Sequence, residues 1–217
     1  MRDNQKTKEY FEEYLAKQET KIATTKPMFD PANPNPMAAH MLFRAQFNKL
    51  MGLFSIGGSK EELVVALNDV LTTCECKDDM EYDDLVSLLS LAYLLDVNPE
   101  KGLKETIYFK IDTFLCMLTD ALNITPDCEI ETANYDPYDF LFNNINKNST
   151  KEEVEAALLE YLEDEWYDLS EDWYWFETLD NSNNVYFGYW SFEAMAIAKM
   201  FDIDLTKLIE SDFFSKI

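Results

Sequence analysis

The chain has 217 residues, of which 47% are hydrophobic and 14% aromatic, a composition typical of a globular protein with a sizeable core. It carries 42 acidic and 18 basic residues, and this formal net charge of −24 excludes a general nucleic-acid binder, which needs Lys and Arg to displace counterions from phosphates. The same charge argues against docking on an anionic membrane and favours a basic protein partner.

Helical periodicity dominates the first half of the chain. A polar helix is expected over residues 3–23, followed by a stiff proline-rich connection. The next helix is expected to end at Gly57-Gly58, and Ser59 with Glu62 forms the sequence pattern of a capping box that starts a third helix. A fourth apolar stripe covers residues 85–95, and a long helix is predicted over residues 103–123.

The second half continues the helical pattern. Thr150 with Glu153 predicts a second capping box, and the helix that follows is expected to run on to Trp166. Residues 192–201 are apolar almost all round, which is typical of a buried helix. A short final helix is expected over residues 204–210, and only residues 184–189 suggest a strand.

These elements predict an all-α fold, a helical bundle of about eight helices in two packed parts. Pro126 and Pro137 flank an acidic loop region, and we place a domain boundary there. The expected N-terminal helical domain is residues 1–125, and the expected C-terminal acidic helical domain is residues 126–217. Residues 1–126 have a net charge of −7 and residues 127–217 a net charge of −17, so the second half is expected to hold the functional surface.

The sequence offers no set of residues typical of catalysis or of cofactor binding. His40 is the only histidine and lies in an apolar helical pattern, where a packing or capping role is expected. The four cysteines, at 74, 76, 116 and 128, lack the spacing of a metal site. We therefore expect no enzyme, no cofactor and no metal site. The charged N-terminal sequence and the lack of a long apolar run predict a cytoplasmic protein with reduced thiols.

Residues 161–180 combine eight acidic and seven aromatic side chains without a single Lys or Arg. On a helix, Glu163 and Asp164 would face outward, together with Tyr167, while Tyr161, Leu162, Glu165 and Trp166 would continue the inward stripe. Two interpretations stay open: core aromatics beside solvated acids, or a contact surface of aromatic anchors ringed by acids. On the second interpretation, the candidate residues for binding a basic protein partner are Glu163, Asp164, Asp168, Glu171, Asp172, Trp173 and Trp175.

Residues 185–200, VYFGYWSFEAMAIAKM, resemble the signature of the PoNi-type immunity proteins, which protect bacteria from PoNe-type polymorphic DNase toxins. As in that family, a Gly-Tyr-Trp-Ser-Phe-Glu-Ala run opens an Ala-rich helix that ends in Ala-Lys, here Gly188 to Lys199. The start, MRDNQKTKEYFEEYLAKQE, is similar to the family's Arg-Asp start followed by a Tyr-Phe helix. Met195 and Met200 stand where smaller or aliphatic residues are usual.

The resemblance implies an all-helical immunity protein in two domains that binds the nuclease domain of a secreted toxin in the cytosol. A DNase holds DNA in a basic cleft, so an acidic inhibitor would associate with it quickly, either at the active site or beside it. No binding residue is carried over from the family. Other interpretations are an acidic helical adaptor for another basic partner, a DNA-mimic regulator with several partners, and a metal-dependent hydrolase, which loss of activity with a chelator would support.

Overall fold

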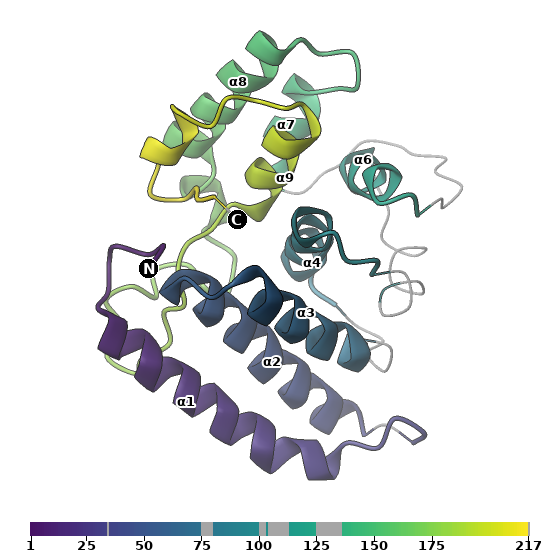
Figure 1. The fold of residues 1–217 in the computed structure, drawn as a ribbon, viewed down its shortest axis with the longest axis vertical. Coiled ribbons are helices and arrows are strands. Elements are labelled where there is room, and N and C mark those ends of the chain that lie inside the picture. Colours follow the sequence, from purple (N-terminus) through teal and green to yellow (C-terminus); the bar gives the residue numbers. More distant parts are fainter. Residues whose placement is uncertain (34, 75–79, 100–102, 104–112, 125–135, 217) are drawn as a thin grey trace. The chain divides into compact units, whose positions relative to one another are not determined.

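A computed structural model describes residues 1–33, 35–74, 80–99, 103, 113–124 and 136–216 (Figure 1). Over these residues the fold is all-α, as predicted, and no strand is present. The α-helices are α1 (Lys8–Thr25), α2 (Pro36–Ile56), α3 (Lys60–Cys74), α4 (Tyr82–Leu95), α6 (Thr113–Ala121), α7 (Tyr138–Asn144), α8 (Lys151–Glu160) and α9 (Phe192–Met200). Short 3₁₀ turns are η1 (Lys26–Met28), η3 (Asp168–Ser170) and η4 (Leu208–Glu210), and η2 (Tyr161–Glu165) is a π-helical turn.

The chain forms two compact units that are interleaved along the sequence. Unit 1 comprises Met1–Met80, Pro99–Thr106 and Glu177–Gly188. Unit 2 comprises Glu81–Asn98, Ile107–Phe176 and Tyr189–Ile217. The domain boundary predicted between residues 125 and 126 lies outside the described residues and stays a prediction.

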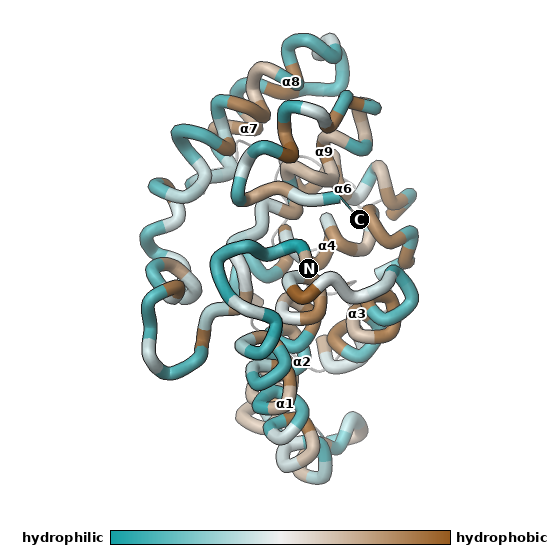
Figure 2. The backbone as a smooth tube through the Cα atoms, turned by 60° about the vertical axis from the view of Figure 1, so that its left-hand side comes forward, coloured by the Kyte–Doolittle hydropathy of each residue, from teal (hydrophilic) through white to brown (hydrophobic). Residues whose placement is uncertain are grey.

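In unit 1, α1 and α3 both pack on α2. The Asn35 side chain accepts hydrogen bonds from the backbone N–H groups of Met37 and Ala38 at the start of α2, and Gly57 ends it with a left-handed φ of 94°. A Cβ at Gly52 would lie 2.9 Å from Cδ1 of Tyr14, so α1 approaches α2 closely at this glycine. Along its length α1 is more hydrophilic than α2 (Figure 2).

The start of the first helix differs from the prediction. Thr7 caps α1 by accepting a hydrogen bond from the Tyr10 N–H, so the helix begins at Lys8 rather than at residue 3. Asp3 is buried, and its carboxylate accepts hydrogen bonds from the Gln5 N–H and from the Tyr186 hydroxyl at 2.6 Å. These bonds stabilise a non-helical backbone ahead of Thr7, because an Asp side chain competes with helical hydrogen bonding.

Both predicted capping boxes are confirmed. The Ser59 N–H donates to the Glu62 carboxylate at 2.8 Å, and the Glu62 N–H donates to the Ser59 hydroxyl at 3.3 Å. Thr150 and Glu153 make the same reciprocal pair at the start of α8. Each box satisfies two backbone donors at a helix N-terminus, and so fixes where the helix begins.

In unit 2, α9 packs against α4, and the prediction of a buried helix here is confirmed. Every residue of α9 from Phe192 to Ala198 is buried. Lys199 follows them and donates hydrogen bonds to the carbonyl oxygens of Tyr93 and Leu94 and to the Asp96 carboxylate. A cation at the C-terminal end of α4 satisfies carbonyl groups that the helix itself leaves unpaired, and it interacts favourably with the helix dipole.

Other expectations are corrected in part. The final helix expected over residues 204–210 is only the 3₁₀ turn Leu208–Glu210. Of the long helix predicted over residues 103–123, the structure describes Leu103, α6 and a turn at residues 122–123, and residues 104–112 lie outside the described residues. Cys74 is buried, and Cys116 is disulfide-bonded, contrary to the expectation of reduced thiols throughout. Residues 184–189 form no strand. Among the described residues, no helix has the length and apolarity to cross a membrane.

Candidate protein-binding site

The acidic and aromatic stretch begins where α8 changes its hydrogen-bonding pattern. The prediction of a regular α-helix up to Trp166 is wrong, because Tyr161–Glu165 form a π-helical turn in which the Trp166 N–H donates to the Tyr161 carbonyl at 2.7 Å. A π turn accommodates one more residue than an α turn. Tyr161, Leu162 and Trp166 are buried as expected, whereas Tyr167, expected outside, is only partly exposed.

Six rings of unit 2, four of them from this stretch, form an aromatic cluster. Trp166 stacks on Trp175 with 5.1 Å between ring centroids and also contacts Phe213 at 4.9 Å. Tyr167 contacts Phe176 at 4.7 Å and Tyr189 at 5.2 Å. Offset and tilted ring pairs at these separations contribute stability beyond the area that they bury. The aromatic cluster consists of Trp166, Tyr167, Trp175, Phe176, Tyr189 and Phe213.

The five acidic candidates, which we call the acidic strip, are all exposed. Within the part of the chain that the structure describes, none of the five takes part in an ion pair. Residues 152–198 contain thirteen acidic residues and no Lys or Arg, so no basic side chain of this segment neutralises the strip. The acidic strip consists of Glu163, Asp164, Asp168, Glu171 and Asp172.

The two tryptophan candidates lie at the margin between core and solvent. Trp173 and Trp175 are both partly exposed. Trp173 contacts the buried Tyr138 at 6.4 Å between centroids, and Trp175 lies between Trp166 and Tyr189. Each ring therefore contacts another ring of unit 2 while part of the side chain remains accessible, and both interpretations stay open at these positions.

A buried carboxylate next to the stretch was not predicted. Glu193, in the first turn of α9, is 2% exposed and accepts hydrogen bonds from the Tyr161 hydroxyl at 2.9 Å and the Ser191 hydroxyl at 2.7 Å. Burial raises the pKa of Glu193, and the hydrogen bond from Ser191 opposes that rise. Burial, followed by the charge of Glu193, raises the pKa of Tyr161 and of Tyr138. The sequence signal was the acid inside an otherwise apolar helix.

Glu193→Gln is expected to change the pH dependence of stability. A carboxyl group whose pKa is higher in the folded state binds a proton more readily when folded, so its contribution is fully present below the unfolded pKa and is lost as pH rises through the folded pKa. The free energy of unfolding of the wild type should therefore fall relative to that of Glu193→Gln as pH rises from about 4 to 8. Urea unfolding of both proteins across this range measures the difference, in which the other carboxylates cancel. Parallel profiles would contradict the assignment.

The residues that carry the family-like sequence motifs have structural contacts. Gly188 has a φ of 106°, a conformation that L side chains rarely adopt. Arg2 donates hydrogen bonds to the carbonyl oxygens of Phe54 and Gly58, and its guanidinium lies 4.6 Å from the centre of the Phe54 ring. The N-terminal motif therefore fixes the end of α2 through Arg2. The motif at residues 185–200 places Gly188 in the turn before α9. Among the described residues, no group of three or more His, Cys, Asp or Glu side chains could hold a metal ion.

These observations define an acidic, all-helical protein whose second unit carries the exposed acidic strip and the aromatic cluster. Residues 110–216 match the family model described as "PoNe immunity proteins (PoNi), C-terminal". Through this region the chain belongs to the PoNi family, and it is an immunity protein for PoNe nuclease toxins. No curated protein and no solved structure matches the chain.

Proposed function

We propose that the protein neutralises the nuclease of its PoNe toxin by binding it, with the acidic strip facing the basic surface that the nuclease uses to hold DNA. The single observation that carries this proposal is the acidic strip itself, exposed and without an ion pair in the described part of the chain, in the region that matches the family. We place this inhibition in the cytoplasm, and the protein acts by occupying a surface rather than by altering the toxin chemically.

Electrostatics would determine how fast the two proteins meet. Because no Lys or Arg occurs in residues 152–198, the negative potential over this segment is not offset locally. A field of one sign attracts an oppositely charged partner and can raise the association rate by one to three orders of magnitude. Salt screens this attraction over about 10 Å at 0.1 M ionic strength, so association should slow as salt is added.

The tryptophans would determine how long the complex lasts. Partly exposed Trp173 and Trp175 are held by contacts with Tyr138, Trp166 and Tyr189, so little side-chain freedom remains to be lost on binding. Rigid aromatic side chains of this kind are enriched among the residues that dominate binding energy. Charges at the rim act mainly on association, and buried rings act mainly on dissociation.

The test reverses three acids of the strip. Glu163→Lys, Asp164→Lys and Asp168→Lys together should slow association with the purified nuclease domain at least about tenfold and remove most of its dependence on salt. The matched control is Glu13→Lys, Asp120→Lys and Glu210→Lys, which changes the net charge equally at exposed acids outside the strip. Association rates are measured by stopped-flow fluorescence between 50 and 500 mM salt, with helical content checked first.

The outcomes separate the candidate functions. Equal slowing by both triple variants would show that net charge acts without a defined surface, and the strip would then be no interface. Wild-type binding to several unrelated DNA-binding proteins with similar affinity would favour a DNA-mimic regulator, and a complex with a different basic protein alone would favour an adaptor. A toxin recovered in cleaved or covalently altered form would rule out inhibition by binding alone.

A further inference from the structure

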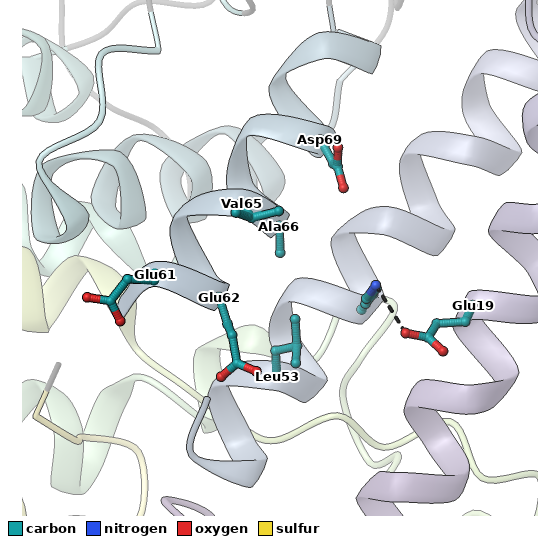
Figure 3. A pocket seen from close by; sticks show the side chains of 8 residues that line it. Glu19, Leu53, Glu61, Glu62, Val65, Ala66 and Asp69 are labelled. Atoms are coloured by element: carbon teal, nitrogen blue, oxygen red, sulfur yellow. Dashed lines mark ion pairs between the residues drawn. The ribbon is translucent and has the colours of Figure 1, made fainter. Parts of the chain in front are cut away.

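A groove in unit 1 lies over α2, between α1 and α3 (Figure 3). It has a volume of about 370 Å³ and lies outside the region that matches the family model. α1 contributes one side chain on one side and α3 contributes five on the other. The lining residues are Glu19, Lys49, Leu53, Glu61, Glu62, Val65, Ala66 and Asp69.

The spacing of residues along α3 explains how one helix supplies this wall. Four lining side chains of α3 share one face of the helix, because their positions in the sequence differ by three, one and three. They are Glu62, Val65, Ala66 and Asp69. A second face of α3, with Leu63, Leu67 and Val70, is fully buried. The Ser59–Glu62 capping box fixes the first turn of α3, and it therefore fixes which side chains point into the groove.

The centre of the groove is apolar and open. Val65 on α3 is 63% exposed, and Leu53 on α2 is half-buried. Ala66, the next residue along α3, is buried. A partner side chain that covered Val65 would remove apolar surface from water at about 25 cal/mol per Å².

The rim of the groove is acidic. Four carboxylates line it, against one lysine, and that lysine is already paired, because Lys49 Nζ lies 3.2 Å from Glu19 Oε1. Glu61, Glu62 and Asp69 are exposed on α3. Hydrogen bonds from its own backbone N–H and from Ser59 lower the pKa of Glu61. An apolar anchor flanked by positive charge fits this combination of an open valine and an acidic rim.

We propose that this groove binds a segment of the toxin's nuclease domain that presents one apolar side chain flanked by Lys or Arg. The proposal rests on the proposed function, and it adds a second contact, made by unit 1, to the contact made by the acidic strip. The apolar side chain covers Val65 and Leu53, and the flanking cations pair with the carboxylates of α3.

Val65→Lys tests the groove directly. The new charge occupies the apolar centre and repels a basic segment, so dissociation from the purified nuclease domain should be at least about tenfold faster. Val65 is exposed, and the substitution should therefore leave folding intact. The matched control is Ile209→Lys, which makes the same kind of change at an apolar residue that is 42% exposed in unit 2. Equal dissociation rates for the two variants would overturn the proposal.

Two further measurements distinguish this proposal from the proposed function. Combined with the triple reversal of the acidic strip, Val65→Lys should add its full effect, because separate contacts contribute independently. A benzophenone amino acid at position 65 should cross-link to a nuclease peptide that carries Lys or Arg beside an apolar residue; a cross-link to another copy of this chain alone would overturn the groove. If the strip variants slow association while Val65→Lys has no effect, only the groove proposal fails. If the wild type does not bind the nuclease domain, both fail.

Discussion

Ile197→Asp is expected to prevent unit 2 from folding. Ile197 is fully buried on α9, the helix that packs against α4, and its neighbours Ala194, Ala196 and Ala198 are also fully buried. The substitution would place a carboxylate in this apolar interior and would also remove the packing of a large aliphatic side chain. Together these effects should cost about 3–5 kcal/mol, a large fraction of the 5–15 kcal/mol that stabilises an ordinary domain.

Circular dichroism and thermal unfolding measure this effect, with Ile197→Val as the control. The valine variant removes one methylene group and should lose only about 0.5–1.5 kcal/mol. Ile197→Asp should accumulate in the insoluble fraction or show a broad, low-temperature transition. A soluble aspartate variant with the helical content and melting temperature of the wild type would mean that α9 does not lie in the core.

Trp175→Ala is expected to shorten the lifetime of the complex with the nuclease. Trp175 is partly exposed and rests on Trp166 and Tyr189, so it has the rigidity of an aromatic anchor. If it is a buried anchor in the complex, its removal should cost about 2–4 kcal/mol, which corresponds to dissociation about 30- to 1,000-fold faster. Surface plasmon resonance with immobilised nuclease domain measures the two rates separately.

The controls for this prediction separate binding from packing. Trp175→Phe keeps a ring against Trp166 and should lose much less affinity than the alanine variant. Trp173→Ala removes the other candidate ring, whose recorded ring contact is with Tyr138. Helical content must match the wild type in each variant. An unchanged dissociation rate for both alanine variants in folded protein would leave these rings a role in the core of unit 2 alone.

Features that depend on a few neighbouring residues could be predicted from the sequence. The Ser59 and Thr150 capping boxes and the left-handed Gly57 that ends α2 occur where the pattern placed them, because each relies on local backbone chemistry. The buried α9 was also predictable, since a helix that is apolar all round has no face to present to water. The exposure of the five acids of the strip follows the same logic.

Features that depend on tertiary structure could not be predicted. The Tyr161 side chain, at the start of the π turn, donates a hydrogen bond to Glu193, thirty-two residues away, and no local pattern encodes that contact. Asp3 was expected inside a helix, but its side chain pairs with Tyr186 across 183 residues. The groove of unit 1 could not be predicted, because its acidic rim comes from two helices, α1 and α3, whose packing no local pattern encodes.

The interleaving of the units has a consequence for synthesis of the protein on the ribosome. The Lys199 bond to Leu94 joins residues 105 positions apart, and α9 packs against α4 at the same place. At about 5–20 residues per second, α4 must wait roughly 5–20 s after its own synthesis before α9 exists. During that interval the leucines of α4 that are fully buried in the finished protein, Leu85, Leu88, Leu89 and Leu91, lack this covering helix. A chain interrupted before residue 192 is therefore expected to be an aggregation-prone fragment rather than a folded part of the protein.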